Sequence, residues 1–215
     1  MESSKLAIEH WNKTPLFISE EERYSLYPWL YEVAEFTKHA GERVLEIGCG
    51  TGCDLLQFAK HGAHATGVDI TSEHLRLARE RVQGLAEVKK ADATQLPFAD
   101  NDYVYSHGVI HHIEKPRRVI DEILRVLRPG GHFNIHVYAL FSYFVVARIV
   151  RHRRNWRLYI ENSRDPVHID FYTARKLRRL FAPIEVTVAK FGCPPVPALD
   201  SVAGFFLVAK GQKPG

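Results

Sequence analysis

The stretch from Val44 to Leu56, VLEIGCGTGCDLL, constrains the fold of this chain more than any other segment. Residues suited to a strand come first, then three closely spaced glycines, Gly48, Gly50 and Gly52, and then an apolar-spaced helical stretch. Glycine accepts a positive φ and lets a ligand approach the backbone where a Cβ would be in the way. One glycine would be enough for a tight connection between a strand and a helix. Three predict a turn that holds a ligand.

Strand and helix signals alternate through the middle of the chain. We expect strands over 43–47, 64–69, 87–90, 103–106 and 132–138, with helices over 51–60, from Thr71 or Ser72, and from Pro116 to Leu127. Such alternation predicts an α/β fold in which a parallel sheet is covered by helices on both faces. A basic helix over 173–181 and strands over 185–191 and 204–210 follow. Because we expect no helix between these two strands, they should pair antiparallel at the sheet edge.

The length of 215 residues fits a single domain. We divide it into a helical N-terminal arm or lid (1–42), a cofactor-binding half (43–138), an insertion or cover (139–172), and a C-terminal helix with an edge hairpin (173–215). In the arm, Ser19 and Glu22 have the spacing of a capping box, so a helix should start there. Pro28 should kink or interrupt that helix.

Composition narrows the class of protein. The formal net charge is only +4, too small to indicate nucleic acid as a partner. The three cysteines have no zinc-ligand spacing and are odd in number, so neither a metal site nor a disulfide framework is predicted. The first residues lack the apolar core of a signal peptide, and the apolar stretch 139–150 contains Arg148 and is too short to span a bilayer. We therefore expect a cytoplasmic protein.

Glu46 discriminates between ligands of the glycine turn. A dinucleotide fingerprint needs Gly-x-Gly-x-x-Gly or Ala, with a pyrophosphate on the helix N-terminus. Gly48 and Gly50 match, but the third position is Cys53, which weakens this reading and leaves it open. A carboxylate at Glu46 would repel a pyrophosphate, whereas it would attract an ammonium group. The turn therefore favours a ligand with a cationic end.

Two further carboxylates follow the next strands. Asp69 closes the second strand, where a carboxylate can accept hydrogen bonds from both hydroxyls of a ribose. The alternative for Asp69 is an N-cap of the following helix. Asp92 follows the third strand and can take the amino group of adenine, with the backbone amide of Ala93 beside it. Ribose, adenine and an ammonium-bearing tail together describe S-adenosylmethionine.

Five segments now carry a resemblance to a known family: VLEIGCGTG, GVDI, ADATQLPF, SHGVIHHIEKP and VLRPGGHFNI. They resemble, in this order, the successive motifs of class I S-adenosylmethionine-dependent methyltransferases, in particular the branch of the ubiquinone/menaquinone-biosynthesis methyltransferases. The resemblance covers 43–137 and implies a Rossmann-like, doubly wound sheet of seven strands and S-adenosyl-L-homocysteine as product. With Gly52 of the glycine turn added, the expected cofactor-binding residues are Glu46, Gly48, Gly50, Gly52, Asp69, Ile70, Asp92, Ala93 and Ser106.

Histidines stand where the acceptor of the methyl group would bind. Methyl transfer from a sulfonium is an in-line displacement that needs alignment, and a base only if the nucleophile must lose a proton. His111 and His112 follow the fourth strand, and His112 is our catalytic candidate; a histidine that fixes the loop is the alternative. The resemblance also brings His168, ahead of a helix that Thr173 would cap, toward the acceptor. His111 and His168 are substrate candidates.

The arm and the insertion supply the remaining candidates. Tyr24, Tyr27 and Tyr31 would share one face if their helix continued through Pro28, and family arms lie over the active site; core packing is the alternative. We expect the arm and 165–173 to close over the methyl group, with Tyr24 and Tyr27 in the pocket. The run 139–157 is apolar, then rich in arginine. It reads as a cover helix with a solvated end, as a flap for an apolar substrate or a membrane surface, or as a phosphate-contacting patch.

Methyl transfer to a small-molecule acceptor is the favoured function. An RNA or protein methyltransferase, a non-catalytic S-adenosylmethionine-binding module and a nicotinamide oxidoreductase are the alternatives. Enzymes that methylate exocyclic amines of bases commonly carry an Asn/Asp-Pro-Pro-aromatic run after the fourth strand, and this chain has Ser-His-Gly-Val at 106–109. The sequence leaves the acceptor and the oligomeric state open.

Overall fold

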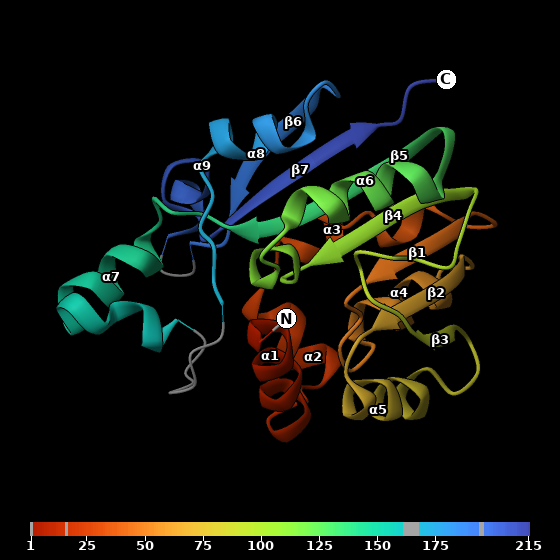
Figure 1. The fold of residues 1–215 in the computed structure, drawn as a ribbon, viewed down its shortest axis with the longest axis horizontal. Helices are drawn as coiled ribbons and strands as arrows, with labels where there is room; N and C mark the ends of the chain where they lie inside the picture. Colours follow the sequence, from red (N-terminus) through yellow and green to blue (C-terminus); the bar gives the residue numbers. More distant parts are fainter. Residues whose placement is uncertain (1, 16, 161–167, 194–195) are drawn as a thin grey trace.

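The computed structural model describes residues 2–15, 17–160, 168–193 and 196–215, and its strands form one sheet in the order β3-β2-β1-β4-β5-β7-β6 (Figure 1). The strands are β1 (Arg43–Ile47), β2 (His64–Asp69), β3 (Glu87–Lys90), β4 (Asn101–His107), β5 (Leu127–Tyr138), β6 (Val186–Phe191) and β7 (Phe206–Gln212). Strands β1 to β5 pair parallel, and β7 runs antiparallel to both β5 and β6. The predicted α/β, Rossmann-like sheet of seven strands with an antiparallel edge is confirmed.

Helices cover both faces of the sheet. On one face α6 (Pro116–Val126) and α8 (Ala174–Phe181) pack on Val104 and Phe133; on the other α4 (Cys53–Lys60) and α5 (Ser72–Val82) pack with Tyr103 and Tyr105. Neighbouring residues of one strand serve different faces because successive side chains of a strand point to opposite sides. Burial of both faces explains the apolar character of the central strands.

The N-terminal arm consists of short helices: α1 (Glu2–Lys13), α2 (Glu20–Leu26), α3 (Leu30–Val33) and the 3₁₀ turn η1 (Phe36–Lys38). The capping box is confirmed, since Ser19 N donates to Glu22 Oε2 at 2.8 Å and Glu22 N to Ser19 Oγ at 3.0 Å. Helix α2 ends before Pro28, as expected. Tyr24 lies in α2, Tyr27 is the C-cap residue of α2, and Tyr31 lies in α3. The predicted stripe of tyrosines required one helix continuing through Pro28, and that helix does not form.

The connection between β6 and β7 differs from the prediction. The strands pair antiparallel as expected, but the turn η4 (Pro197–Leu199) and the helix α9 (Asp200–Ala203) lie between them. The two strands still pair antiparallel, because the short helical segments lengthen the connection between β6 and β7 without changing the direction of β7. Helix α1 was also not predicted from the sequence.

The insertion after β5 contains α7 (Tyr143–His152) and the 3₁₀ segment η3 (Arg153–Tyr159). Figure 1 shows α7 standing away from the body of the sheet, beyond the end of β5. Residues 161–167 lie outside the described part of the chain, so the predicted closing segment 165–173 is described only from His168. There Tyr172 forms a parallel bridge with Ala139.

Candidate functional site

A cavity of about 620 Å³ lies at the carboxyl ends of β1, β2 and β4. The glycine turn, the end of β2, the segment after β3 and the segment after β4 all line it. The N-terminal arm contributes Ile8, Trp11, Ile18, Arg23 and Tyr27. Carboxyl ends of parallel strands are where open α/β sheets bind ligands. The arm therefore forms part of the wall, as the sequence predicts for a lid.

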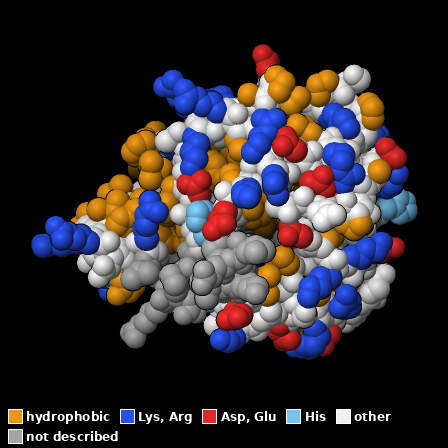
Figure 2. Space-filling view, viewed as in Figure 1, with side chains coloured by type: hydrophobic (Ala, Val, Ile, Leu, Met, Phe, Trp, Pro, Cys, Tyr) orange, Lys and Arg blue, Asp and Glu red, His pale blue; other side chains and the backbone are white. Residues whose placement is uncertain are grey.

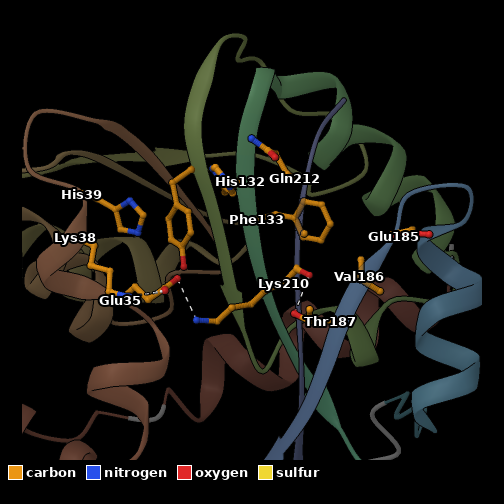
Figure 3. Close-up of a pocket in the computed structure, with 12 residues that line it drawn as sticks. Glu35, Lys38, His39, His132, Phe133, Glu185, Val186, Thr187, Lys210 and Gln212 are labelled. Carbon is orange, nitrogen blue, oxygen red and sulfur yellow. Dashed lines mark hydrogen bonds and ion pairs between the residues drawn. The ribbon is translucent and has the colours of Figure 1, made fainter. Parts of the chain in front are cut away.

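A second cavity of similar volume lies at the opposite ends of β4 and β5 (Figure 3). Three of its charged groups pair with one another: Glu35 Oε1 lies 2.9 Å from Lys38 Nζ, and Glu35 Oε2 lies 3.0 Å from Lys210 Nζ. None of the predicted site residues lines it. We therefore place the candidate site in the first cavity.

The three glycines of the turn have different roles, although all have positive φ (71°, 51° and 79°). A Cβ at Gly48 would lie 2.2 Å from Val109 Cγ2, so this position must stay small for the chain to pass the segment after β4. A Cβ at Gly50 would meet nothing within 4 Å, and Gly50 lines the cavity. A Cβ at Gly52 would lie 3.2 Å from Ala78, and Gly52 does not line the cavity. Gly52 therefore serves the packing of α4 on α5 rather than the ligand.

Glu46 is a buried carboxyl in the cavity wall. It lies on β1 opposite Gly67 and Tyr105, and only 3% of it is exposed. Its Oε2 has no hydrogen-bond partner among the described residues. Burial, and then the charge of Asp54, raise the pKa of Glu46 well above its usual range. A buried oxygen without a partner fits a cationic donor from a ligand, such as the ammonium group of S-adenosylmethionine.

Arg23 and Asp54 join the arm to α4 beside Glu46. Arg23 donates from Nε to Asp54 Oδ1 at 2.6 Å and from Nη2 to Oδ2 at 2.5 Å. The hydroxyls of Tyr24 and Tyr105 each donate to the same carboxylate at 3.0 Å. Burial works to raise the pKa of Asp54, but the guanidinium of Arg23 holds it below its usual range. The sequence gives no local signal for this pair because its partners lie 31 positions apart.

Tyr24 and Tyr27 have different surroundings. Tyr27 lines the cavity, as predicted, next to His107 and Phe206. Tyr24 does not line it; its ring packs on Tyr31 and Phe36, and its hydroxyl serves Asp54. The prediction of Tyr24 as a pocket residue is therefore corrected to a structural one.

Asp69 shapes the glycine turn. Its Oδ2 accepts a hydrogen bond from Gly50 N at 3.0 Å, and its Oδ1 accepts from Thr71 N and Oγ1 at 2.9 and 2.8 Å. Burial opposes ionisation, but hydrogen bonds from His74 and Thr71 keep the pKa of Asp69 below its usual range. Thr71 is the N-cap residue of α5, and Asp69 is not. Asp69 and Ile70 both line the cavity, so the predicted ribose contact stays a prediction that the geometry allows.

Asp92 and Ala93 also line the cavity, after β3. Asp92 Oδ1 accepts from Thr94 N and Oγ1 at 2.8 and 2.7 Å, which fixes the carboxylate at this position. Ser106 does not line the cavity. Its hydroxyl is fully buried and donates to the carbonyl of Ile47 at 2.9 Å, so its side chain ties β4 to β1 rather than reaching a cofactor.

Aromatic side chains and histidines form the far end of the cavity. His112 lines it, and its Nδ1–H donates to the carbonyl of His168 at 2.9 Å. His168 thus contributes through its backbone and does not line the cavity. His111 is fully buried, stacks on Tyr138 at 3.6 Å, and has no partner for either ring nitrogen among the described residues. His111 therefore lies behind the wall and is not the substrate contact that we predicted.

His107 lines the cavity and was not among the residues predicted from the sequence. A series of hydrogen bonds through Asn134 and His136 shows which ring nitrogen of His107 carries the proton. Asn134 Nδ2 donates to Val33 O at 2.7 Å, so Asn134 Oδ1 accepts from His136 Nε2 at 2.9 Å. His136 Nδ1 then accepts from His107 Nδ1 at 2.8 Å, which leaves the lone pair of His107 on Nε2.

Burial keeps both of these rings neutral. It lowers the pKa of His136 to about 3 and, together with the charge of Arg23, lowers the pKa of His107 well below the usual value. Tyr27 and Phe206 surround the His107 ring. The cavity therefore presents a neutral hydrogen-bond acceptor within an aromatic wall. Such a group can orient an O–H or N–H of a bound molecule.

The chain is similar to known methyltransferases over part of its length. Residues 45–135 match the family described as a methyltransferase domain. A demethylmenaquinone methyltransferase of Clavibacter sepedonicus is 40% identical over 101 residues, which is 45% of this chain and 41% of the relative. A ubiquinone/menaquinone biosynthesis C-methyltransferase of Roseobacter denitrificans is 31% identical over 151 residues, 58% of this chain and 60% of the relative. The chain thus spans less than two thirds of either relative.

Solved structures show the same fold. The methyltransferase in a complex with the Trm112 methyltransferase activator of Haloferax volcanii superposes with a TM-score of 0.71 at 18% identity, covering 97% of this chain and 98% of that one. This similarity shows that the chain has the fold of that methyltransferase, and the match over 45–135 is to the methyltransferase domain family. Phosphoethanolamine N-methyltransferase 2 of Haemonchus contortus, solved in complex with S-adenosyl-L-methionine, has a similar fold, with a TM-score of 0.68 at 18% identity, covering 99% of this chain and 57% of that one.

Proposed function

We propose that this chain transfers a methyl group from S-adenosyl-L-methionine to a small, largely apolar acceptor. The single observation that carries the proposal is the composition of one continuous cavity. Carboxylates line it next to the glycine turn, and aromatic rings with the neutral ring of His107 line it beyond β4 and β5. A cationic nucleoside fits the first part, and a ring compound fits the second.

At the cofactor end, the residues bind and orient. S-adenosyl-L-methionine supplies a sulfonium whose methyl group is open to in-line displacement. Glu46 would accept a hydrogen bond from the ammonium group, since its Oε2 is otherwise without a partner. Gly50 leaves the backbone open to the ligand, and Asp69 holds that backbone in place through Gly50 N. Asp69 and Asp92 would accept hydrogen bonds from the ribose and the adenine.

At the acceptor end, the residues align the nucleophile and exclude water. His107 Nε2 carries a lone pair that can accept the hydrogen of an attacking hydroxyl or amine, and the ring of His112 lines the same cavity. Tyr27, Tyr138 and Phe206 surround that position with apolar surface. Alignment and removal of water can supply much of the acceleration of a displacement reaction. We therefore propose that His107 and His112 contact the acceptor; His112 is the catalytic candidate predicted from the sequence.

The acceptor class follows from the same wall. Two of the curated relatives are named for methylation of demethylmenaquinone or for ubiquinone/menaquinone biosynthesis, which supports a ring compound as acceptor. A flat ring can stack between aromatic side chains, and its hydroxyl can reach a neutral histidine. We infer an aromatic hydroxy compound or quinol as the acceptor class.

The test is transfer of label from methyl-labelled S-adenosyl-L-methionine to a panel of phenols, quinols and amines. We expect labelled product and an equal amount of S-adenosyl-L-homocysteine with a phenol or quinol. Binding of S-adenosyl-L-homocysteine with no transfer to any of them would favour a non-catalytic binding module. Transfer to RNA or protein instead would move the acceptor to another class.

A further inference from the structure

A projecting surface on the insertion has no role in the cavity. We call it the α7 surface; it consists of Phe141, Tyr143, Val146, Ile149, Val150, Arg151, Arg153, Arg154 and Arg157. All of these residues are exposed. Helix α7 stands beyond the end of β5 (Figure 1), and the cavity lies at the carboxyl ends of the neighbouring parallel strands.

The apolar part of the α7 surface forms a stripe. Tyr143, Val146 and Val150 follow one another at positions i, i+3 and i+7 of α7, so they share one face of the helix. Val150 is 75% exposed and Phe141 68%. On the other side of α7, Val145 is buried against the core of the insertion. The helix therefore buries one narrow side and turns a second apolar stripe outward, which a merely solvated cover helix would not need.

The charge of the α7 surface has one sign. Among the described residues, no carboxylate pairs with Arg151, Arg153, Arg154 or Arg157, and the sequence contains no Asp or Glu from 123 to 160. Figure 2 shows Lys and Arg side chains at the outer end of an apolar region on this side of the molecule. Exposed arginines without acidic partners attract an anionic surface.

Three kinds of partner could bind a surface that is both apolar and rich in arginine: RNA, a second copy of the chain, and a lipid bilayer. RNA would use the arginines but would leave the apolar stripe in water. A second copy of the chain, related by a two-fold axis, would bring the same arginines together and repel them. An anionic bilayer satisfies both parts, because apolar side chains enter the boundary with the acyl chains while arginines meet the headgroups.

We propose that the α7 surface binds the surface of an anionic lipid bilayer. Among the described residues no helix is long and apolar enough to cross a membrane, so α7 would lie in the plane of the interface. Residue Tyr138, at the end of β5, lines the cavity and α7 follows it closely. If the proposed function holds, this arrangement brings the acceptor end of the cavity near the layer in which an apolar acceptor dissolves.

The experiment is co-sedimentation of the full chain with vesicles. One set contains phosphatidylcholine alone and the other contains phosphatidylcholine mixed with phosphatidylglycerol. We expect binding to the mixed vesicles only, and weaker binding at high salt because salt screens the arginines. The double variant Val146→Asp/Val150→Asp and the triple variant Arg151→Glu/Arg153→Glu/Arg154→Glu should each reduce the bound fraction by about tenfold or more.

Matched controls separate this surface from general effects. Leu85→Asp changes an exposed apolar residue that lies after α5, and Arg175→Glu/Arg178→Glu reverses exposed charges on α8; both should bind vesicles as the unchanged chain does. Circular dichroism and thermal unfolding of every variant show whether it is folded. These readouts do not depend on methyl transfer.

Several results would overturn the proposal. They are the absence of binding to the anionic vesicles, an equal loss in the control variants, and binding to an RNA oligonucleotide that competes with the vesicles. Self-association in analytical ultracentrifugation that Val146→Asp/Val150→Asp abolishes would assign the stripe to a second copy instead.

Discussion

Arg23 of the N-terminal arm forms a bidentate ion pair with Asp54 at the start of α4, with Nε 2.6 Å from Oδ1 and Nη2 2.5 Å from Oδ2. Only 15% of the Arg23 side chain and 1% of the Asp54 side chain are exposed. The pair lies beside Glu46 and fixes the arm against the wall of the cavity. Removing one partner of a buried pair is costly because the other charge is left buried and unpaired.

Arg23→Met should therefore destabilise the fold strongly. We expect a loss of about 3–5 kcal/mol in the free energy of unfolding. The control is Lys38→Met, which removes an exposed lysine from its pair with Glu35 and leaves Glu35 paired with Lys210, so it should cost less than about 1 kcal/mol. Urea unfolding measures both, and equal losses in the two variants would show that the Arg23–Asp54 pair does not anchor the arm.

Buried histidines should make the fold sensitive to acid. Burial lowers the pKa of His107, His111 and His136 below the value of an unfolded chain. As the pH falls below about 6.5, these histidines become protonated in the unfolded chain but stay neutral in the folded one. Each of them therefore lowers the free energy of unfolding by up to about 1.4 kcal/mol per pH unit. Glu46 acts in the opposite direction, because its raised pKa lets the folded chain keep a proton that the unfolded chain loses above about pH 4.5, so this contribution to stability declines as the pH rises toward the folded pKa. The histidines outnumber it, and we expect net destabilisation toward acid.

His111→Phe isolates this effect. The ring of His111 stacks on Tyr138 and its nitrogens have no partner, so a phenyl ring can replace it without losing a hydrogen bond. We expect unchanged or higher stability at neutral pH and a smaller loss between about pH 7 and about pH 5. Urea unfolding at both values measures this, and an unchanged pH dependence would contradict a neutral, buried His111.

The arm should shape the acceptor end more than the cofactor end. Trp11 and Tyr27 line the cavity, and Trp11 lies 5.6 Å from the ring of His112. Replacing either by alanine should lower methyl transfer by about tenfold or more, with a smaller effect on S-adenosyl-L-homocysteine binding. Leu26→Ala, an exposed neighbour of Tyr27, is the control. Equal effects on transfer and on binding would argue that the arm shields the cofactor alone, and deletion of 1–30 should abolish transfer in either case.

His107 should matter for turnover rather than for cofactor binding. If His107 accepts the proton of the nucleophile, His107→Phe should lower the rate by about 10²–10⁴ while binding of S-adenosyl-L-homocysteine is retained. His112→Phe gives the matched comparison on the same wall. Steady-state transfer and calorimetric binding separate the two effects. Unchanged turnover in both variants would leave these histidines structural.

Local sequence predicted the sheet and one side of the site well. The bounds of β1, β2 and β3 agree with the prediction because each is a short strand ended by a turn signal. Glu46, Gly48, Gly50 and Asp92 meet at one cavity because the carboxyl ends of parallel strands share an edge. Their spacing in the sequence was therefore sufficient to bring them together.

The residues that the sequence misplaced depend on contacts between distant segments. Ser106 and Gly52 stand in cofactor motifs, but one bonds to β1 and the other packs on α5. His107 acquires its tautomer from His136 and Asn134, which lie on a different strand. No local pattern encodes such partners. The same holds for Trp11, which α1 brings to the cavity from a segment that we did not predict to be helical.

The central claim is that Glu46 receives the ammonium group of the cofactor, and isothermal titration with S-adenosyl-L-homocysteine tests it most directly. The pKa of Glu46 is raised in the unliganded chain, and a nearby cation would lower it, so binding should release a proton and the heat should vary with the ionisation enthalpy of the buffer. Glu46→Gln should abolish that release and weaken binding by about 1–3 kcal/mol, whereas NAD should not bind to either form. Binding of NAD without any response to S-adenosyl-L-homocysteine, or proton release that persists in Glu46→Gln, would contradict the assignment.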